Sequence, residues 1–282
     1  MKSKKNTLPM LMGILNVTPD SFSDGGQHNT PKQAIARAIE MINQGAKIID
    51  IGGESTRPGA KEVSSHEQIE RVIPVIEGIR NSKDSKVKDI IISIDTTDYH
   101  VAKQALVAGA NWINDISAGE DSAGGTEQMI KLAADKNAPI ILMHRQGKSD
   151  RMQDNPQYDD VCLEVKSYLQ ERAELALKSG VAKENVILDP GIGFGKLLKH
   201  NLALLADLDA LVALGYPILL GTSRKRFLGE LLDQDDPKQR VIGTCATTAL
   251  GVQAGVQIFR VHDVIENKQA MDVAWAITKS KL

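Results

Sequence analysis

The chain alternates between short apolar runs and longer segments in which apolar residues recur three and four positions apart. The short runs are rich in Ile and Val and nearly uninterrupted, which is typical of parallel strands buried on both faces. Helical spacing is clearest at 34–42 and at 161–177, where apolar residues repeat along one face. The pattern predicts eight strands, at residues 10–16, 47–52, 90–95, 111–115, 140–144, 186–189, 218–221 and 258–261.

Eight strands separated by helices, without a linker or a low-complexity tract, predict an α/β fold. We expect residues 1–282 to form a single-domain (β/α)8 barrel, also called a TIM barrel, with residues 1–9 as a frayed leader. An open, doubly wound sheet is the alternative, but the near-constant spacing of the eight units favours closure. Five glycines precede strands and are expected to end helices, because glycine reaches the left-handed conformation without a Cβ penalty: Gly45, Gly109, Gly180, Gly215 and Gly255.

Charge and composition narrow the class of protein. The 34 basic and 36 acidic residues give a net charge of −2, so no global positive field favours nucleic acid or an anionic membrane as a partner. The basic and apolar segment 2–17 resembles a short signal peptide, but no small-residue cleavage site follows it. No run reaches the roughly 18 apolar residues of a membrane span. Cys162 and Cys245 can form no disulfide framework and lack metal-ligand spacing, which favours a reducing cytoplasm.

Polar side chains stand where almost every predicted strand ends. In a (β/α)8 barrel the chemistry lies at the C-terminal ends of the strands. Any one polar residue there can be explained as a helix cap, but eight successive strand ends of this kind predict a polar pocket at the barrel mouth. The residues at these ends are Asn16, then Gly52 to Glu54, Asp95, Asn114 and Asp115, His144, Asp189, Ser223 with Lys225, and Arg260 with His262.

The predicted pocket has two chemically different parts. Acceptors at three strand ends would match a flat heterocycle with an amidine or guanidine edge: Asp95, Asn114 and Asp189. A phosphate or pyrophosphate suits the cationic and amide groups of Arg260, His262 and Asn16. From the residues alone, Lys225 is either a charge partner or, if desolvated, a Schiff-base nucleophile.

Three loops carry turn-forming residues. Segments 17–27 and 53–61 concentrate Gly, Pro, Ser, Thr and Asp, and we expect them to be two long, mobile βα loops over the C-terminal face of the barrel. The glycine-rich segment 189–196 lacks both the dinucleotide and the Walker spacing. Its glycines are better explained by a close approach of backbone to a ligand beside Asp189.

Eight motifs, in order, resemble those of the dihydropteroate synthase family, and the resemblance covers the chain from Met12 onward. The first two motifs are long and specific. The motifs are MGILNVTPDSFSDGG at 12–26, DIGGESTRPGA at 50–60, IDT at 94–96, NDISAG at 114–119, LMH at 142–144, LDPGIGFGK at 188–196, GTSRK at 221–225 and RVHDV at 260–264.

The resemblance implies a reaction and a set of site residues. The family condenses 6-hydroxymethyl-7,8-dihydropterin pyrophosphate with 4-aminobenzoate in folate biosynthesis, by an SN1-like displacement that releases pyrophosphate and gives 7,8-dihydropteroate. The resemblance implies that the pterin is bound by Asp95, Asn114, Asp189 and Lys225. It implies that pyrophosphate is bound by Asn16, Arg260 and His262, with a Mg²⁺ ion at Asn16. The 4-aminobenzoate pocket is implied to consist of Thr56, Pro58, Phe194 and Ser223. Catalysis is assigned to Asp95, Lys225, Arg260 and His262.

Two further expectations concern assembly and departures from the family. The family commonly forms homodimers through its last helices, which makes 243–255 and 273–277 candidates for an interface. Arg145 stands where methionine is common, so it adds a cation near the pterin entrance or points to solvent. The alternatives are a pterin-binding methyltetrahydrofolate methyltransferase, a Schiff-base aldolase that uses Lys225, and a catalytically silent pterin-binding protein.

Overall fold

The computed structural model describes residues 8–18, 31–54, 63–121, 127–147 and 155–280. Its eight strands are all parallel and lie in the order β6-β5-β4-β3-β2-β1-β8-β7. A parallel bridge between Leu188 and Ile218 joins the two ends of this order, so the sheet closes into a barrel. The predicted (β/α)8 fold is therefore confirmed. The strands are β1 Met10–Asn16, β2 Ile48–Gly52, β3 Ile91–Asp95, β4 Trp112–Asp115, β5 Ile140–Met143, β6 Val186–Asp189, β7 Leu219–Leu220 and β8 Ile258–Val261.

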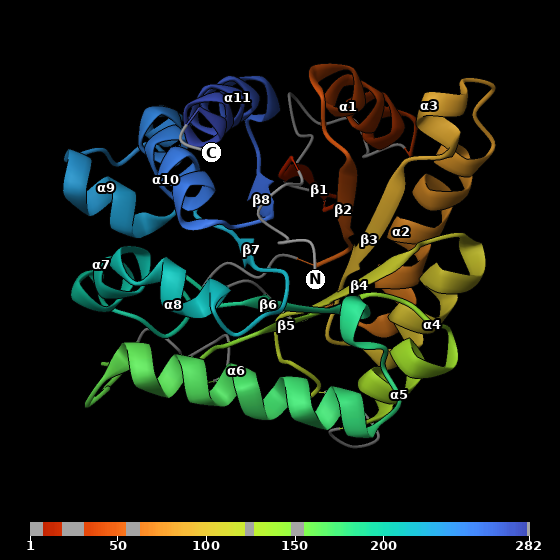
Figure 1. Ribbon diagram of the computed structural model, residues 1–282. Coiled ribbons are helices and arrows are strands. Elements are labelled where there is room, and N and C mark those ends of the chain that lie inside the picture. Colours follow the sequence, from red (N-terminus) through yellow and green to blue (C-terminus); the bar gives the residue numbers. More distant parts are fainter. Residues whose placement is uncertain (1–7, 19–30, 55–62, 122–126, 148–154, 281–282) are drawn as a thin grey trace.

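Helices surround the barrel on its outside (Figure 1). Their buried residues form one large cluster with the outward faces of the strands. The helices are α1 Pro31–Gln44, α2 Ser65–Arg80, α3 Ser85–Lys88, α4 Tyr99–Ala108, α5 Gln128–Asp135, α6 Val161–Lys178, α7 Leu198–Ala206, α8 Leu208–Val212, α9 Arg226–Leu232, α10 Val241–Ala254 and α11 Val264–Lys279.

The barrel interior is a second, smaller apolar cluster. Because side chains alternate along a strand, every second residue of each strand faces inward. The inner cluster fills the lower part of the barrel with Met12, Ile48, Ile141, Ile187, Leu219 and Ile258. Two residues further along, the inward positions on β2 and β8 are Asp50 and Arg260. The lower interior is thus apolar, and polar side chains begin one layer higher, toward the strand C-termini.

The predicted elements agree with the structure to within a residue or two. The bounds of β1, β6 and β8 match the prediction, whereas β7 spans two residues instead of the four predicted at 218–221. On α6 the predicted apolar face holds as far as Ala173, and Ala176 rather than Leu177 is the next buried residue. A helix turns once in 3.6 residues, so a strict spacing of four drifts off the buried face.

Glycine ends α10 as predicted. Gly255 has a φ of 96° and its N–H bonds to Gly251 O, which closes the helix immediately before β8. The two loops expected over the barrel mouth lie largely outside the described residues, as does most of the predicted leader. Among the helices that the structure describes, none has both the length and the apolar character needed to cross a membrane.

Candidate functional site

A network of buried charged and amide side chains lies inside the upper barrel. Arg260 on β8 donates from Nε to Asp50 Oδ2 at 2.6 Å and from Nη2 to Asp95 Oδ2 at 2.5 Å. Asn114 on β4 donates from Nδ2 to the same Asp50 oxygen at 3.0 Å. The three strands β2, β3 and β4 are adjacent, with Gly52 opposite Asp95 and Asp95 opposite Asn114. Strand register therefore brings together residues that are distant in the chain.

Asp50 is a site residue that the sequence analysis did not single out. It is fully buried and holds both Arg260 and Asn114. The prediction considered only the residues at which strands end, and Asp50 lies two positions before the end of β2. A signal was present, because an Asp within the apolar run IIDIG is rarely buried without a partner.

Two carboxylate oxygens of this network have unused hydrogen-bonding capacity. Asp50 Oδ1 and Asp95 Oδ1 are buried, and neither has a hydrogen-bond partner among the described residues. A buried acceptor without a donor costs about 1–3 kcal/mol. The arrangement therefore suits a ligand that presents N–H groups to the floor of the barrel mouth.

The environment of Asp95 moves its pKa close to neutrality. Burial raises its pKa to about 7, the nearby carboxylates of Asp50, Asp115 and Glu54 raise it as well, and Arg260 lowers it. Burial is the largest of these effects. A carboxyl group with a pKa near neutrality in a polar cavity is typical of a functional site.

Asp189 and Lys225 occupy the neighbouring side of the pocket. Asp189 Oδ1 accepts from the N–H of Gly191 at 2.7 Å, and burial raises the pKa of Asp189 while Lys225 lowers it. The Lys225 ammonium donates to the carbonyl of Ile192 and lies 4.5 Å from the centre of the Phe194 ring. Burial lowers the pKa of Lys225 to about 8, although Asp189 opposes this effect.

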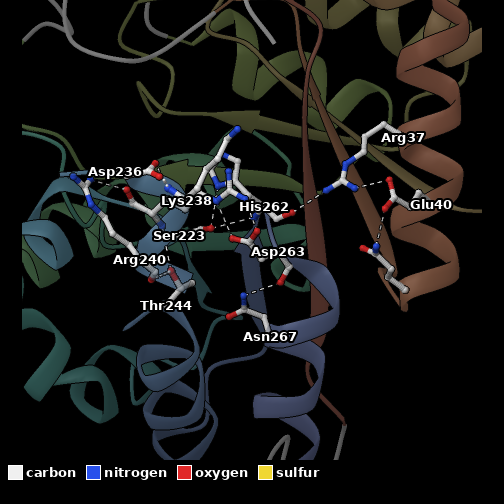
Figure 2. A network of polar contacts seen from close by, with 12 residues as sticks. Arg37, Glu40, Ser223, Asp236, Lys238, Arg240, Thr244, His262, Asp263 and Asn267 are labelled. Carbon is white, nitrogen blue, oxygen red and sulfur yellow. Dashed lines mark hydrogen bonds and ion pairs between the residues drawn. The ribbon is translucent and has the colours of Figure 1, made fainter. Parts of the chain in front are cut away.

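Ser223 and His262 form a second polar cluster beside the pocket. Ser223 Oγ lies 2.9 Å from His262 Nδ1 and accepts from the His262 backbone N–H at 3.0 Å. Figure 2 shows both residues close to Asp263 at the start of α11, with Arg37 reaching the His262 carbonyl from α1. Arg224, the residue after Ser223, forms an ion pair with Asp263. These contacts fix the backbone at the C-terminal ends of β7 and β8.

Asn16 lies at the mouth beside the acidic network. A Cβ built on Gly52 would lie 3.6 Å from both Asn16 Oδ1 and Asp95 Oδ2, so glycine leaves the space between them open. Within the described ranges, no three His, Cys, Asp or Glu side chains are grouped to hold a metal ion. Thr56 and Pro58, predicted to shape the 4-aminobenzoate pocket, lie outside the described residues.

Arg145 does not point to solvent, which is one of the two positions predicted for it. Its guanidinium forms an ion pair with Asp121, and its side chain is only 5% exposed. Asp121 belongs to the segment that follows β4, so this pair joins the ends of β4 and β5. The residue is therefore held in an ion pair between the segments that follow β4 and β5 instead of extending into solvent, and its place near the pterin entrance stays a prediction.

Comparison with known proteins gives consistent matches along nearly the whole chain. The profile of the family described as "Pterin binding enzyme" matches residues 12–262. A dihydropteroate synthase of Synechocystis is 49% identical over 95% of this chain and 89% of its own length.

Solved structures match equally well. A Yersinia pestis dihydropteroate synthase in a sulfonamide drug complex has a TM-score of 0.87 and 45% identity, covering 96% of this chain and 94% of that one. The enzyme of Xanthomonas albilineans in complex with 7,8-dihydropteroate has a TM-score of 0.83 and 40% identity, covering 96% and 95% of the two chains.

Proposed function

This chain belongs to the dihydropteroate synthase family of pterin binding enzymes, and from that premise we propose how its pocket performs the condensation. The reaction joins 6-hydroxymethyl-7,8-dihydropterin pyrophosphate to 4-aminobenzoate. Its products are 7,8-dihydropteroate and pyrophosphate. The protein is thus a transferase whose substrates are two small molecules, and whose product belongs to folate biosynthesis.

The pterin ring is bound by the acidic floor of the barrel mouth. Asp189 accepts from the 2-amino group and N3 of the ring, since a carboxylate matches such a guanidine-like edge with two parallel hydrogen bonds. Asn114 and Asp95 bind the remaining ring edge, and Lys225 contacts the side that carries the ring oxygen. The observation that supports this assignment most strongly is the pair of unpartnered buried oxygens, Asp50 Oδ1 and Asp95 Oδ1.

The pyrophosphate group is bound at the cationic edge, by Arg260, His262 and Asn16. Arg260 engages two carboxylates through Nε and Nη2, and a guanidinium has five N–H donors. The amide oxygen of Asn16 fits Mg²⁺, because this ion takes oxygen ligands and usually binds few protein groups beside substrate phosphates. When bound there, Mg²⁺ would neutralise charge on the leaving group.

The displacement proceeds through a cation. The bond between the pterin methylene carbon and the pyrophosphate oxygen breaks, and its electron pair leaves with pyrophosphate, whose charge Arg260 and His262 neutralise. The methylene cation is delocalised into the ring, where ionised Asp95 stabilises it in a pocket that excludes water. The amine nitrogen of 4-aminobenzoate then forms the new bond and loses a proton. An arylamine is unprotonated at neutral pH, so no strong general base is required.

The 4-aminobenzoate pocket lies beside Lys225, where Phe194 and Ser223 form the part of it that the structure describes. Phe194 offers an apolar ring next to the lysine ammonium, and Ser223 is held by His262. Thr56 and Pro58 complete the pocket in this proposal. A sulfonamide resembles 4-aminobenzoate in shape and charge, and we propose that it competes for the same place.

We further propose that the protein acts as a homodimer. α10 and α11 enclose a hollow on the surface, with a mainly apolar lining that includes Ala249, Val273 and Ile277. Val273 is 61% exposed and Ile277 48%, and the neighbouring Leu250 is 57% exposed. A contiguous apolar surface of this kind is typical of an interface, and two copies of one helix pair can cover each other by two-fold symmetry.

The two cysteines of the chain are unpaired, which supports the proposal that the reaction takes place in the cytoplasm. The direct test of the proposed activity mixes the purified protein with the two substrates and Mg²⁺, and follows both pyrophosphate and 7,8-dihydropteroate. Equimolar formation of the two products supports the proposal. Methyl transfer from methyltetrahydrofolate without pyrophosphate, or trapping of a substrate on Lys225 by borohydride, would instead support one of the alternatives.

A further inference from the structure

Lys196 is a buried cation that lies outside the pterin and pyrophosphate sites described above. It is the last residue of the glycine-rich segment after β6, and it is only 3% exposed. Its Nζ donates to the carbonyl oxygens of Gly191 at 2.9 Å, Phe194 at 3.0 Å and His144 at 3.3 Å, and it lies 2.9 Å from His144 Nδ1. One side chain therefore joins the loop after β6 to the end of β5.

The partners of Lys196 suit its ammonium form. Carbonyl oxygens only accept hydrogen bonds, and three of them face an amine that would have two N–H groups if it were neutral. Burial lowers the pKa of Lys196 well below its ordinary value, the negative charge of Asp189 opposes this effect, and the positive charge of Lys225 adds to it. Burial also lowers the pKa of His144, to about 3, so its ring is neutral and adds no second positive charge.

Other side chains also hold the loop formed by residues 191–195. Tyr158 donates its hydroxyl to Gly195 O at 2.8 Å, and Asn201 accepts from the N–H of Gly193 at 2.7 Å. The loop also lies directly against the end of β5, because a Cβ built on Gly191 would lie 1.8 Å from the His144 carbonyl oxygen. The backbone of residues 191–195 therefore has little freedom to move.

The opposite side of this loop faces the reaction site. The Ile192 carbonyl accepts from Lys225, the Phe194 ring lies beneath the Lys225 ammonium, and the Gly191 N–H bonds to Asp189. Lys196 thus contacts the backbone on both sides of Ile192, at Gly191 and at Phe194. Any shift of this short segment would move the Phe194 ring and the acceptor that holds Lys225.

We propose that Lys196 is a positioning residue for the second substrate: its buried ammonium fixes the loop 191–195 and so places the Phe194 ring for 4-aminobenzoate. This inference rests on the proposed function. Of the acidic floor, Asp189 is joined to this loop by the Gly191 N–H, whereas the hydrogen bonds of Lys196 go to Gly191, Phe194 and His144. We therefore expect the larger effect on the side of the pocket that holds Phe194.

The test compares Lys196→Met, which keeps the aliphatic chain and removes the ammonium, with Lys199→Met, an exposed lysine on the first turn of α7. Loss of the charged hydrogen bonds is expected to raise the KM for 4-aminobenzoate by about tenfold or more. The Kd of 6-hydroxymethylpterin, measured calorimetrically, should change by a smaller factor than this KM, because, in the part of the chain that the structure describes, only Asp189 and Lys225 of the pterin residues contact the loop. Lys199→Met should match the unaltered protein in both measurements.

Amide hydrogen exchange supplies a readout that needs no substrate. Exchange in peptides covering 190–197 should accelerate in Lys196→Met and stay unchanged in Lys199→Met. A folded Lys196→Met with an unchanged KM for 4-aminobenzoate, or with equal losses for both ligands, would overturn the proposal.

If Lys196→Met does not fold, Tyr158→Phe tests whether fixing the loop 191–195 matters for 4-aminobenzoate, because this substitution removes only the hydrogen bond to Gly195. It should show a smaller change in the same direction, and an unchanged KM together with unchanged exchange would overturn the proposal. If the unaltered protein makes no dihydropteroate, the proposed function fails, whereas the exchange data still report on the lysine contacts.

Discussion

Arg260 Nε lies 2.6 Å from Asp50 Oδ2, so the cation assigned to the pyrophosphate is anchored in the acidic floor assigned to the pterin ring. The two parts of the pocket are therefore in direct contact. Burial lowers the pKa of Arg260, but the charges of Asp50 and Asp95 outweigh this and raise it overall. The ion pairs fix the direction of the guanidinium and keep it charged.

Asp50→Asn tests how this contact affects Asp95. The amide keeps an acceptor for Arg260 but removes a negative charge that raises the pKa of Asp95. If ionised Asp95 is needed for turnover, the acidic limb of kcat/KM against pH should move to lower pH in this variant. Asp209→Asn, on the exposed surface of α8, is the control. A limb that stays in place or moves to higher pH would refute the coupling.

The raised pKa of Asp95 also predicts how stability depends on pH. In the unfolded chain an Asp titrates near pH 4, whereas in the folded protein Asp95 titrates near 7. Protonated Asp95 therefore favours the folded state at low pH, and this contribution is lost as the pH rises through about 7.

Urea denaturation of the unaltered protein and of Asp95→Asn measures this contribution. The free energy of unfolding of the unaltered protein, relative to the variant, should fall between pH of about 4 and 7 and then level off. A relative stability that rises over the same interval would show that the folded protein lowers this pKa.

Asp189→Asn should weaken binding of the pterin ring. The substitution replaces a charged acceptor by an amide that can accept only one of the two hydrogen bonds, at a cost of about 1.5–3 kcal/mol. Calorimetry with 6-hydroxymethylpterin measures this loss, and Asp209→Asn again serves as a control. Unaltered affinity would mean that the ring does not bind at Asp189.

Val273→Arg should separate the proposed dimer into single chains. A bulky charged side chain placed in the mainly apolar hollow between α10 and α11 would have to lose its water when two copies meet there. Sedimentation equilibrium gives the mass directly, and Val107→Arg on α4, where Val107 is 71% exposed, controls for the change in surface charge. The interface is placed wrongly if Val273→Arg keeps the mass of two chains, and also if Val107→Arg loses it.

Sulfonamides should compete with 4-aminobenzoate and bind more tightly when pyrophosphate is present. The expected cause is the order of binding, because the second pocket is complete once the pyrophosphate site is filled. Steady-state inhibition at varied concentrations of each substrate separates the possibilities. Competition with the pterin substrate instead would contradict the geometry proposed for Phe194 and Ser223.

The sequence predicts the scaffold well because burial imposes a simple pattern. A parallel strand covered on both faces must be apolar along its length. The predicted bounds of the strands Val186–Asp189 and Ile258–Val261 therefore agree with the structure. Asp95, Asn114 and Asp189 can also be proposed from the sequence, because they lie at or next to the ends of such runs and the barrel brings strand ends together.

Other site features depend on information that a linear pattern lacks. Asp50 lies within a strand, and its role follows only from the inward register that sets it against Arg260 and Asn114. Lys196 occurs in a glycine-rich segment that predicts a loop, whereas its burial depends on where β5 ends. The position of the Arg145 side chain depends on its ion pair with Asp121, which lies 24 residues earlier in the chain.

We propose that one molecule of the pterin substrate spans the acidic floor and the cationic edge of the barrel mouth. A crystal soaked with 6-hydroxymethyl-7,8-dihydropterin pyrophosphate tests it most directly. We expect the ring on Asp189, Asn114 and Asp95, with the diphosphate against Arg260 and His262. Density that places the ring or the diphosphate in a different cavity from these residues would contradict it.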